Sequence, residues 1–208
     1  MSTIARPHAS IRGVGYITAA VILAWAAYFL VNELEPNGRN FVVLGALRVV
    51  LFGALLSFAR LAGAQARRVG RVGLVMAAAG AVLTLAGGIG AVATDGWWFD
   101  PFAPDAVCTC SYAYVIGLGA LVFALGTTLV GVAGRSGGWL AVAVVLAGVL
   151  YPAVFILQPF GHFVGHAVWL VPWAALAVGL STDPSRTASS AGAVLQGRKA
   201  QPLGGHRG

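Results

Sequence analysis

Six long apolar segments, separated by short polar stretches, constrain the fold of this chain more than any other feature. A helix needs about 20 mostly apolar residues to cross the hydrocarbon core of a bilayer, and each segment comes close to that length. The segments are residues 14–31, 41–59, 72–93, 112–134, 139–157 and 163–180. The sequence therefore predicts an all-α polytopic membrane protein with six transmembrane helices.

The composition agrees with a chain that lies mostly in lipid. Of its 208 residues, 59% are hydrophobic and only 9% are charged, whereas charged residues make up roughly a quarter of a soluble domain. We expect one membrane domain, residues 1–181, with its helices packed as three antiparallel hairpins. Residues 182–208 are rich in Ser, Gly, Ala and Arg without an apolar period, which predicts a disordered basic tail.

The charged residues alternate between the two sides of the predicted bundle. Eleven of the thirteen basic residues fall before the first segment, after the second and fourth segments, or in the tail. The intervening loops carry the acidic residues Glu33, Glu35, Asp95, Asp100 and Asp105, together with Arg39. Because basic loops stay in the cytoplasm during insertion, both termini are predicted to be cytoplasmic. The net charge of +7 then indicates contact with membrane lipid headgroups and not with nucleic acid.

The residue usage also indicates a source and a location. The chain is rich in Ala, Gly, Val and Leu and has twelve arginines to one lysine. In this respect it resembles small polytopic membrane proteins of GC-rich bacteria. The resemblance implies a multi-pass protein of the bacterial inner membrane, and it implies no particular activity.

Glycines recur on one face of the third segment. Gly73, Gly80 and Gly87 are seven residues apart, and Gly119 and Gly126 repeat this spacing in the fourth segment. Glycines on one face let helix backbones approach closely within lipid. The pattern predicts either tight packing of the third segment against the fourth or a contact with a second copy or a partner helix.

Two prolines lie inside the last two segments. Pro152 and Pro172 each lack a backbone donor, and each is expected to kink its helix. Membrane helices tolerate such a kink where neighbouring groups satisfy the freed carbonyls.

Two cysteines and two histidines are the candidates for a metal or redox site. Cys108 and Cys110 are the only cysteines, and His162 and His166 are four residues apart, so the two imidazoles share a helix face. Two sulfurs and two nitrogens suit zinc, or copper(I) if the thiols are reduced. The alternatives are a small disulfide clip in the loop and two interfacial histidines without a metal.

An aromatic stripe predicts a ligand pocket that opens on the outer side. His162, His166, Trp169 and Trp173 share one face of the last segment, and Tyr151, Phe155 and Gln158 share one face of the fifth. A short loop joins the two segments, so the stripes are expected to face each other. Aromatic walls with a few polar groups are typical of small-ligand pockets. The alternative is ordinary packing with an aromatic belt at the membrane interface.

Arg48 is the one charged residue well inside an apolar segment. Intramembrane charges are costly and mark functional sites, so Arg48 joins the predicted pocket residues. The alternatives are that it reaches the headgroups or pairs with Glu33 or Glu35.

No motif in the chain identifies a reaction. It has no phosphate-binding loop and no HExxH sequence. The first hypothesis is therefore a structural, accessory or small-ligand-binding membrane protein without catalysis of its own. The alternative is an outward-facing metal or thiol-redox enzyme that uses the cysteines and histidines. A small transporter is the third hypothesis, which the absence of Asp and Glu deep in any segment weakens.

Overall fold

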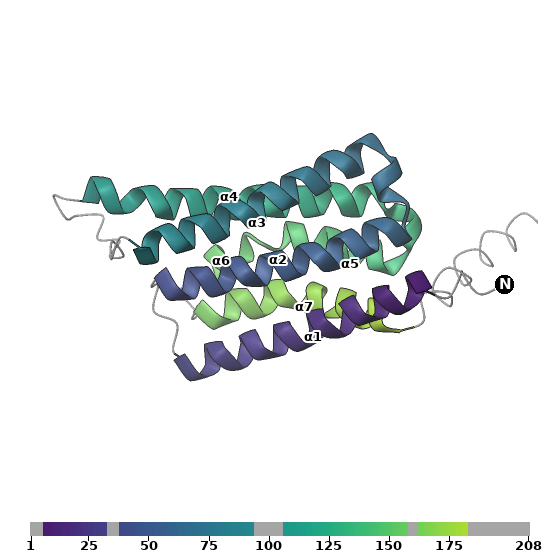
Figure 1. The fold of residues 1–208 in the computed structure, drawn as a ribbon, viewed down its shortest axis with the longest axis horizontal. Helices are drawn as coiled ribbons and strands as arrows, with labels where there is room; N and C mark the ends of the chain where they lie inside the picture. The colour runs from purple at the N-terminus through teal and green to yellow at the C-terminus, as the bar shows by residue number, and fades with distance from the viewer. Residues whose placement is uncertain (1–5, 33–37, 94–105, 158–161, 183–208) are drawn as a thin grey trace, which may run out of the picture.

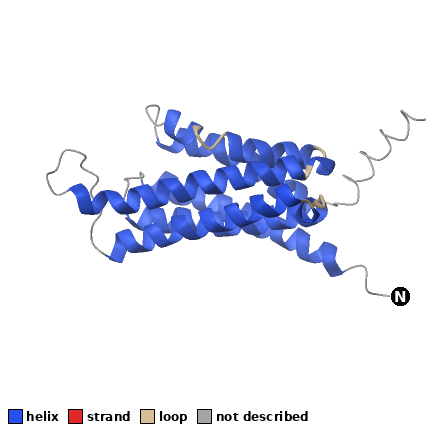
Figure 2. Cartoon of the chain, turned by 90° about the horizontal axis from the view of Figure 1, so that it is seen from above, coloured by secondary structure: helices blue, strands red, loops and turns tan. Residues whose placement is uncertain are grey.

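A computed structural model describes residues 6–32, 38–93, 106–157 and 162–182 of the chain. The elements are helices α1 (Arg6–Asn32), α2 (Gly38–Leu61), α3 (Arg68–Ala93), α4 (Ala106–Ala133), α5 (Trp139–Val149), α6 (Ala153–Ile156) and α7 (His162–Ser181), with the 3-10 turns η1 (Ala64–Ala66) and η2 (Arg135–Gly137). The described residues contain no strand (Figure 2). The described part of the chain is all-helical, as predicted. The predicted tail lies outside the described residues apart from its first residue, Thr182.

Five of the helices are long and apolar enough to cross a membrane, namely α1, α2, α3, α4 and α7. Five such helices indicate a multi-pass membrane protein. The segment 139–157 differs from the prediction of one continuous span, because it is divided into α5 and the four-residue α6. The division falls at Pro152, whose nitrogen has no hydrogen to donate to the carbonyl of Gly148. Pro172, in contrast, lies inside an uninterrupted α7.

The long helices lie side by side along one common direction (Figure 1), and their contacts close a ring in sequence order. Each long helix packs on the one before it, the α5–α6 segment lies between α4 and α7, and α7 returns to pack on α1. Neighbours are antiparallel: the backbone of Gly88 in α3 lies beside Phe41 in α2, whereas Gly45 lies beside Leu85. The predicted antiparallel hairpins are thus joined side by side, without separation into three units.

The closest helix pair is α3 with α4. A Cβ atom on Gly73 would lie 2.7 Å from the carbonyl oxygen of Gly126, and one on Gly80 would lie 2.5 Å from that of Gly119. Gly87 faces the side chain of Ile116 in the same way. Because the glycine face of α3 is covered by α4, a contact with a second copy through these three glycines would have to displace α4. That partner contact remains a prediction.

The outer surface of the bundle is apolar. Large aliphatic side chains point outward on all the long helices, among them Leu23, Val75, Leu125 and Val171. The buried face of α1 has small and aromatic residues at helical spacing: Gly15, Thr18, Ile22 and Trp25. Buried hydroxyls are satisfied within their own helices, as where Thr18 Oγ1 donates to the carbonyl oxygen of Val14 at 2.8 Å. Such an apolar surface is compatible with a lipid environment and not with water.

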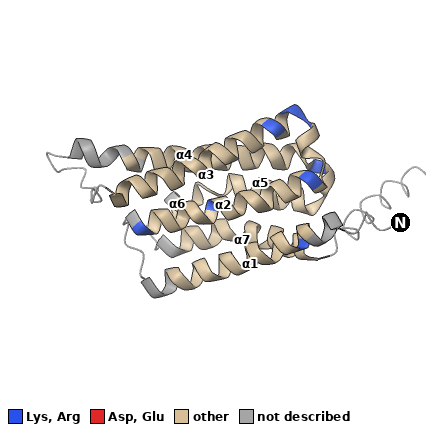
Figure 3. Cartoon of the chain, viewed as in Figure 1, with Lys and Arg blue, Asp and Glu red and all other residues tan. Residues whose placement is uncertain are grey.

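The arginines of the described residues gather at one end of the bundle, where α1 begins and α7 ends (Figure 3). Two contacts join the turns at this end: Arg67 donates to the carbonyl oxygen of Ala133, and Ser136 Oγ donates to that of Ala62 at 2.9 Å. Arg39 begins α2 at the opposite end. Arg48 lies at neither end, because it is within the bundle.

Candidate functional site

The candidate site is centred on Arg48, in the middle part of α2. Its side chain is 1% exposed. Arg48 comes ten residues after the start of the helix at Gly38, or about 15 Å along it at 1.5 Å per residue. The hydrocarbon core is about 30 Å thick. The guanidinium group therefore lies close to mid-depth, and it does not extend to the headgroups.

Two hydroxyl groups hold the guanidinium group. Arg48 Nη1 donates to Thr84 Oγ1 of α3 at 2.9 Å, and Nη2 donates to the hydroxyl of Tyr151 at 2.9 Å. Thr84 is oriented by its own helix, since its hydroxyl donates to the carbonyl oxygen of Gly80 at 2.9 Å. Arg48 thus links α2 with α3 and with the segment between α5 and α6.

The interruption of the fifth segment places Tyr151. Around Pro152 the backbone bonds tighten from the i−4 to the i−3 pattern: the N–H of Tyr151 donates to Gly148 at 3.3 Å, and that of Ala153 donates to Leu150 at 3.0 Å. The carbonyl of Ala147, which the N–H of Tyr151 would reach in an uninterrupted α-helix, needs another donor.

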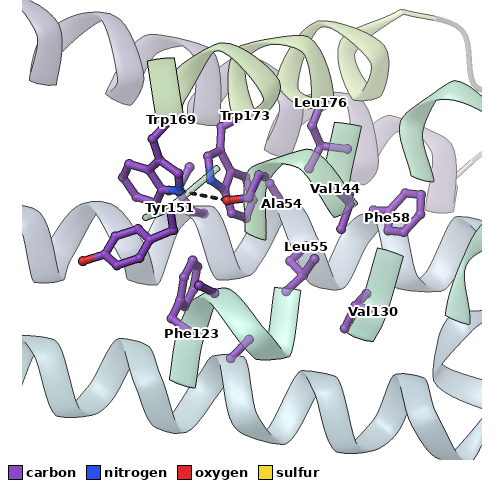
Figure 4. Close-up of a cluster of buried hydrophobic side chains, with 14 of the residues drawn as sticks. Ala54, Leu55, Phe58, Phe123, Val130, Val144, Tyr151, Trp169, Trp173 and Leu176 are labelled. Carbon is purple, nitrogen blue, oxygen red and sulfur yellow. Dashed lines mark hydrogen bonds between the residues drawn. The ribbon is translucent and has the colours of Figure 1, made fainter. Parts of the chain in front are cut away.

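Trp169 of α7 supplies that donor. Its Nε1 donates to the carbonyl oxygen of Ala147 at 2.9 Å (dashed in Figure 4). The Trp169 ring also meets the Tyr151 ring edge-on, with centroids 5.5 Å apart. Trp169 therefore satisfies the interrupted helix and fixes the tyrosine that contacts Arg48.

Aromatic rings surround the charge on the α7 side. The guanidinium carbon of Arg48 lies 5.4 Å from the centroid of Tyr151 and 5.9 Å from that of Trp169, within the range of cation–π attraction. Trp173 continues the stack, 6.5 Å from Trp169 and 5.9 Å from Phe123. In Figure 4 the tyrosine hydroxyl points away from the apolar cluster that these rings join.

No carboxylate accompanies Arg48 among the described residues. All six acidic residues of the chain lie outside the described ranges, and none of helices α1 to α7 contains one. Two buried nitrogens in this region have no hydrogen-bond partner in the part of the chain that the structure describes: Arg48 Nε and Trp173 Nε1. A buried donor without an acceptor costs free energy, so the site lacks an acceptor for each of these two nitrogens.

The structure brings together four of the predicted pocket residues: Arg48, Tyr151, Trp169 and Trp173. Gln158 and the side chain of Phe155 lie outside the described residues. Sequence reasoning missed Thr84. The signal for it was a lone hydroxyl among the Ala, Gly and Leu residues of the third segment. That these residues bind a ligand remains a prediction.

The predicted metal ligands are mostly outside the described part of the chain. This applies to the side chains of Cys108, Cys110 and His162. His166 lies against α1, with its ring 5.5 Å from that of Trp25. Among the described residues no three His, Cys, Asp or Glu side chains gather as a metal would require. The zinc or copper site and the thiol-redox enzyme remain predictions, which metal analysis of the wild type and a His166→Ala variant would test.

Known proteins offer no guide to these residues. No protein-family model matches the chain, and neither the curated proteins nor the solved structures contain a significant match to it.

Proposed function

We propose that this chain is a six-pass protein of the bacterial inner membrane with both ends in the cytoplasm. The sixth pass would be the interrupted segment 139–157, which spans about 28 Å if its 19 residues rise by 1.5 Å each. Its support is that α5 and α6 run antiparallel to both α4 and α7 in a closed ring. The gathering of arginines at one end supports the cytoplasmic assignment of that end.

We further propose that the protein binds a small ligand at the cluster of Arg48, Tyr151, Thr84, Trp169 and Trp173, hereafter the Arg48 cluster. The observation that carries this proposal is a fully buried guanidinium group whose hydrogen-bond partners among the described residues are two neutral hydroxyls. A charge at the centre of a helix in lipid costs about 3 kcal/mol or more. The two hydroxyls are neutral, and the rings of Tyr151 and Trp169 offset the charge without neutralising it, which supports a role for Arg48 beyond cross-linking the helices.

The test is whether a small solute reaches Arg48 in the folded protein. Phenylglyoxal, a small aromatic dicarbonyl, reacts with guanidinium groups, and peptide mass spectrometry identifies the arginines that it modifies. Arg39 is the matched control, since it is exposed on the same helix. We expect Arg48 to react in the detergent-solubilised protein, more slowly than Arg39. An Arg48 that reacts only after unfolding would be a sealed structural cross-link, and the ligand-binding proposal would be wrong.

A small transporter is the second candidate, and one observation favours it. The α5–α6 interruption lies beside the intramembrane charge, and helices broken near mid-membrane form the substrate sites of many transporters. A transport pathway must expose Arg48 to both sides in turn, whereas a binding site needs access from one side only. A sulfonated, impermeant phenylglyoxal, applied to intact cells and to inverted vesicles, distinguishes them: modification from both sides supports transport, and modification from one side supports binding.

A further inference from the structure

The two buried nitrogens without partners indicate what kind of ligand the Arg48 cluster lacks. Arg48 is 1% exposed and Trp173 is 0% exposed, so neither side chain lies on the lipid-facing surface. Arg48 Nε and Trp173 Nε1 each carry one hydrogen and no lone pair to offer. Both are donors, so the missing group is an acceptor.

Arg48 and Trp173 both lie beside the Trp169 ring. The guanidinium group of Arg48 lies 5.9 Å from the centroid of the Trp169 ring, and the Trp173 ring lies 6.5 Å from the same ring. Figure 4 shows the nitrogen edge of Trp173 turned toward Trp169. The nitrogen of Trp169 itself is already bonded to the carbonyl of Ala147. The donors without a partner, Arg48 Nε and Trp173 Nε1, therefore belong to residues on either side of one aromatic ring.

The charge of the cluster further restricts the ligand. Arginine side chains are protonated in proteins, so Arg48 carries a positive charge. No helix of the described structure contains an Asp or Glu to neutralise it. A cation would be repelled. A neutral ligand would accept the hydrogen bonds but would leave the charge uncompensated in a medium of low dielectric constant. An anionic oxygen meets both needs, because it accepts from both donors and neutralises the charge.

We infer that the ligand of the Arg48 cluster is a small organic anion whose carboxylate, or a similar oxyanion, accepts from Arg48 Nε and Trp173 Nε1. This inference rests on the proposed ligand-binding function and specifies its ligand class. The rings of Tyr151 and Trp169 lie beside the charge, so the body of the ligand is apolar and flat. An aromatic carboxylate combines these properties.

The experiment compares two compounds that differ in charge and hardly in shape: 4-nitrobenzoate and 4-nitrobenzamide. Isothermal titration calorimetry measures their binding to the full chain in one detergent. We expect wild-type protein to bind the benzoate about tenfold or more tightly than the amide, since a hydrogen bond to a charged group is about twice as strong as a neutral one. This selectivity is measured on the wild type and needs no variant to fold.

Two variants then test the donors. Arg48→Met is expected to abolish the preference for the benzoate. Trp173→Phe keeps the ring and removes the nitrogen, and it is expected to weaken benzoate binding about tenfold, as for one lost hydrogen bond to a charged group. Tyr114→Phe, on the exposed side of α4, is the matched control and should leave the affinity unchanged.

The outcomes distinguish a failure of the anionic-ligand inference from a failure of the proposed ligand-binding function. Equal binding of the two compounds, or no saturable binding of either, overturns the anionic ligand. If phenylglyoxal nevertheless reaches Arg48 in the folded protein, the ligand-binding function stands. An Arg48 sealed against phenylglyoxal overturns the ligand-binding function itself.

Discussion

Replacing Gly80 by alanine tests whether the α3–α4 contact holds the bundle together. The added Cβ would lie 2.5 Å from the carbonyl oxygen of Gly119, 2.7 Å from the Cα of Phe123, and closer still to the Phe123 nitrogen. All three are backbone atoms, so no side chain can rotate away. Ordinary van der Waals contact begins at 3.4 Å, so the two helices must separate by about 1 Å at this point.

The separation sets the size of the effect. A gap of about 0.5–1 Å removes a quarter to a half of the dispersion energy of each affected atom pair, and α3 with α4 is the most extensive helix contact in the fold. Overpacking of a close contact typically costs about 1–3 kcal/mol. With three backbone clashes and the largest interface, we expect the upper part of that range, a loss of about 2–3 kcal/mol of unfolding free energy relative to a glycine-to-alanine change at a site without clashes, because alanine itself favours the helix by about 1 kcal/mol.

The measurement is reversible unfolding in mixed micelles with increasing sodium dodecyl sulfate, followed by tryptophan fluorescence. Gly117→Ala is the matched control on α4, because a Cβ there meets nothing within 4 Å. We expect the control to be at least as stable as the wild type, since alanine is a better helix former than glycine by about 1 kcal/mol. If Gly80→Ala unfolds at the same detergent fraction as Gly117→Ala, the close approach of α3 and α4 is wrong.

Three further changes test the Arg48 cluster and the topology. Tyr151→Phe removes the acceptor of Arg48 Nη2 and should lower the unfolding free energy by about 1.5–3 kcal/mol, and the loss should shrink when Arg48 is also changed to methionine. Trp169→Phe leaves the carbonyl of Ala147 without its side-chain donor and should cost about 1–3 kcal/mol in the same assay. Gln65→Cys, in a variant without the native cysteines, should react with an impermeant maleimide in inverted vesicles and not in intact cells, since η1 lies at the arginine-rich end.

Each of these changes has a control and a contradicting result. Tyr114→Phe alters an exposed aromatic ring, and it should change stability by less than about 0.5 kcal/mol. Losses equal to those of the buried variants would mean that the hydrogen bonds of the cluster contribute nothing. Labelling of Gln65→Cys in intact cells would place the arginine-rich end outside and refute the proposed orientation.

Segment length and composition were enough to predict an all-helical membrane protein, because the lipid core requires one apolar helix of nearly fixed length per crossing. The interruption of the fifth segment shows where this reasoning stops. Pro152 predicted a kink, yet Pro172 leaves α7 continuous. At the interruption a donor from another helix, Trp169, satisfies the carbonyl of Ala147. A partner in another helix is not visible in the local sequence.

The sequence was enough to predict most residues of the candidate site but not the hydrogen bonds between them. Helical spacing placed Tyr151 and Trp169 on facing stripes, and their rings meet. It gave no reason to connect Arg48 with Thr84, which is 36 residues away, because that pair depends on α2 packing beside α3 at one register. The same holds for the glycines of α3, since a spacing of seven identifies a face without identifying the helix that covers it.

The closing of the ring by α7 on α1 has a consequence for biogenesis. During translation α1 is made before, and α7 after, the five helices between them, yet α1 packs mainly on α7. The face of α1 at Gly15 is approached closely by the backbone of Ala177 and Leu180. This face is therefore in contact with lipid until the last helix of the ring is inserted. Expulsion of that lipid is then a late step of assembly, after which the bundle is complete.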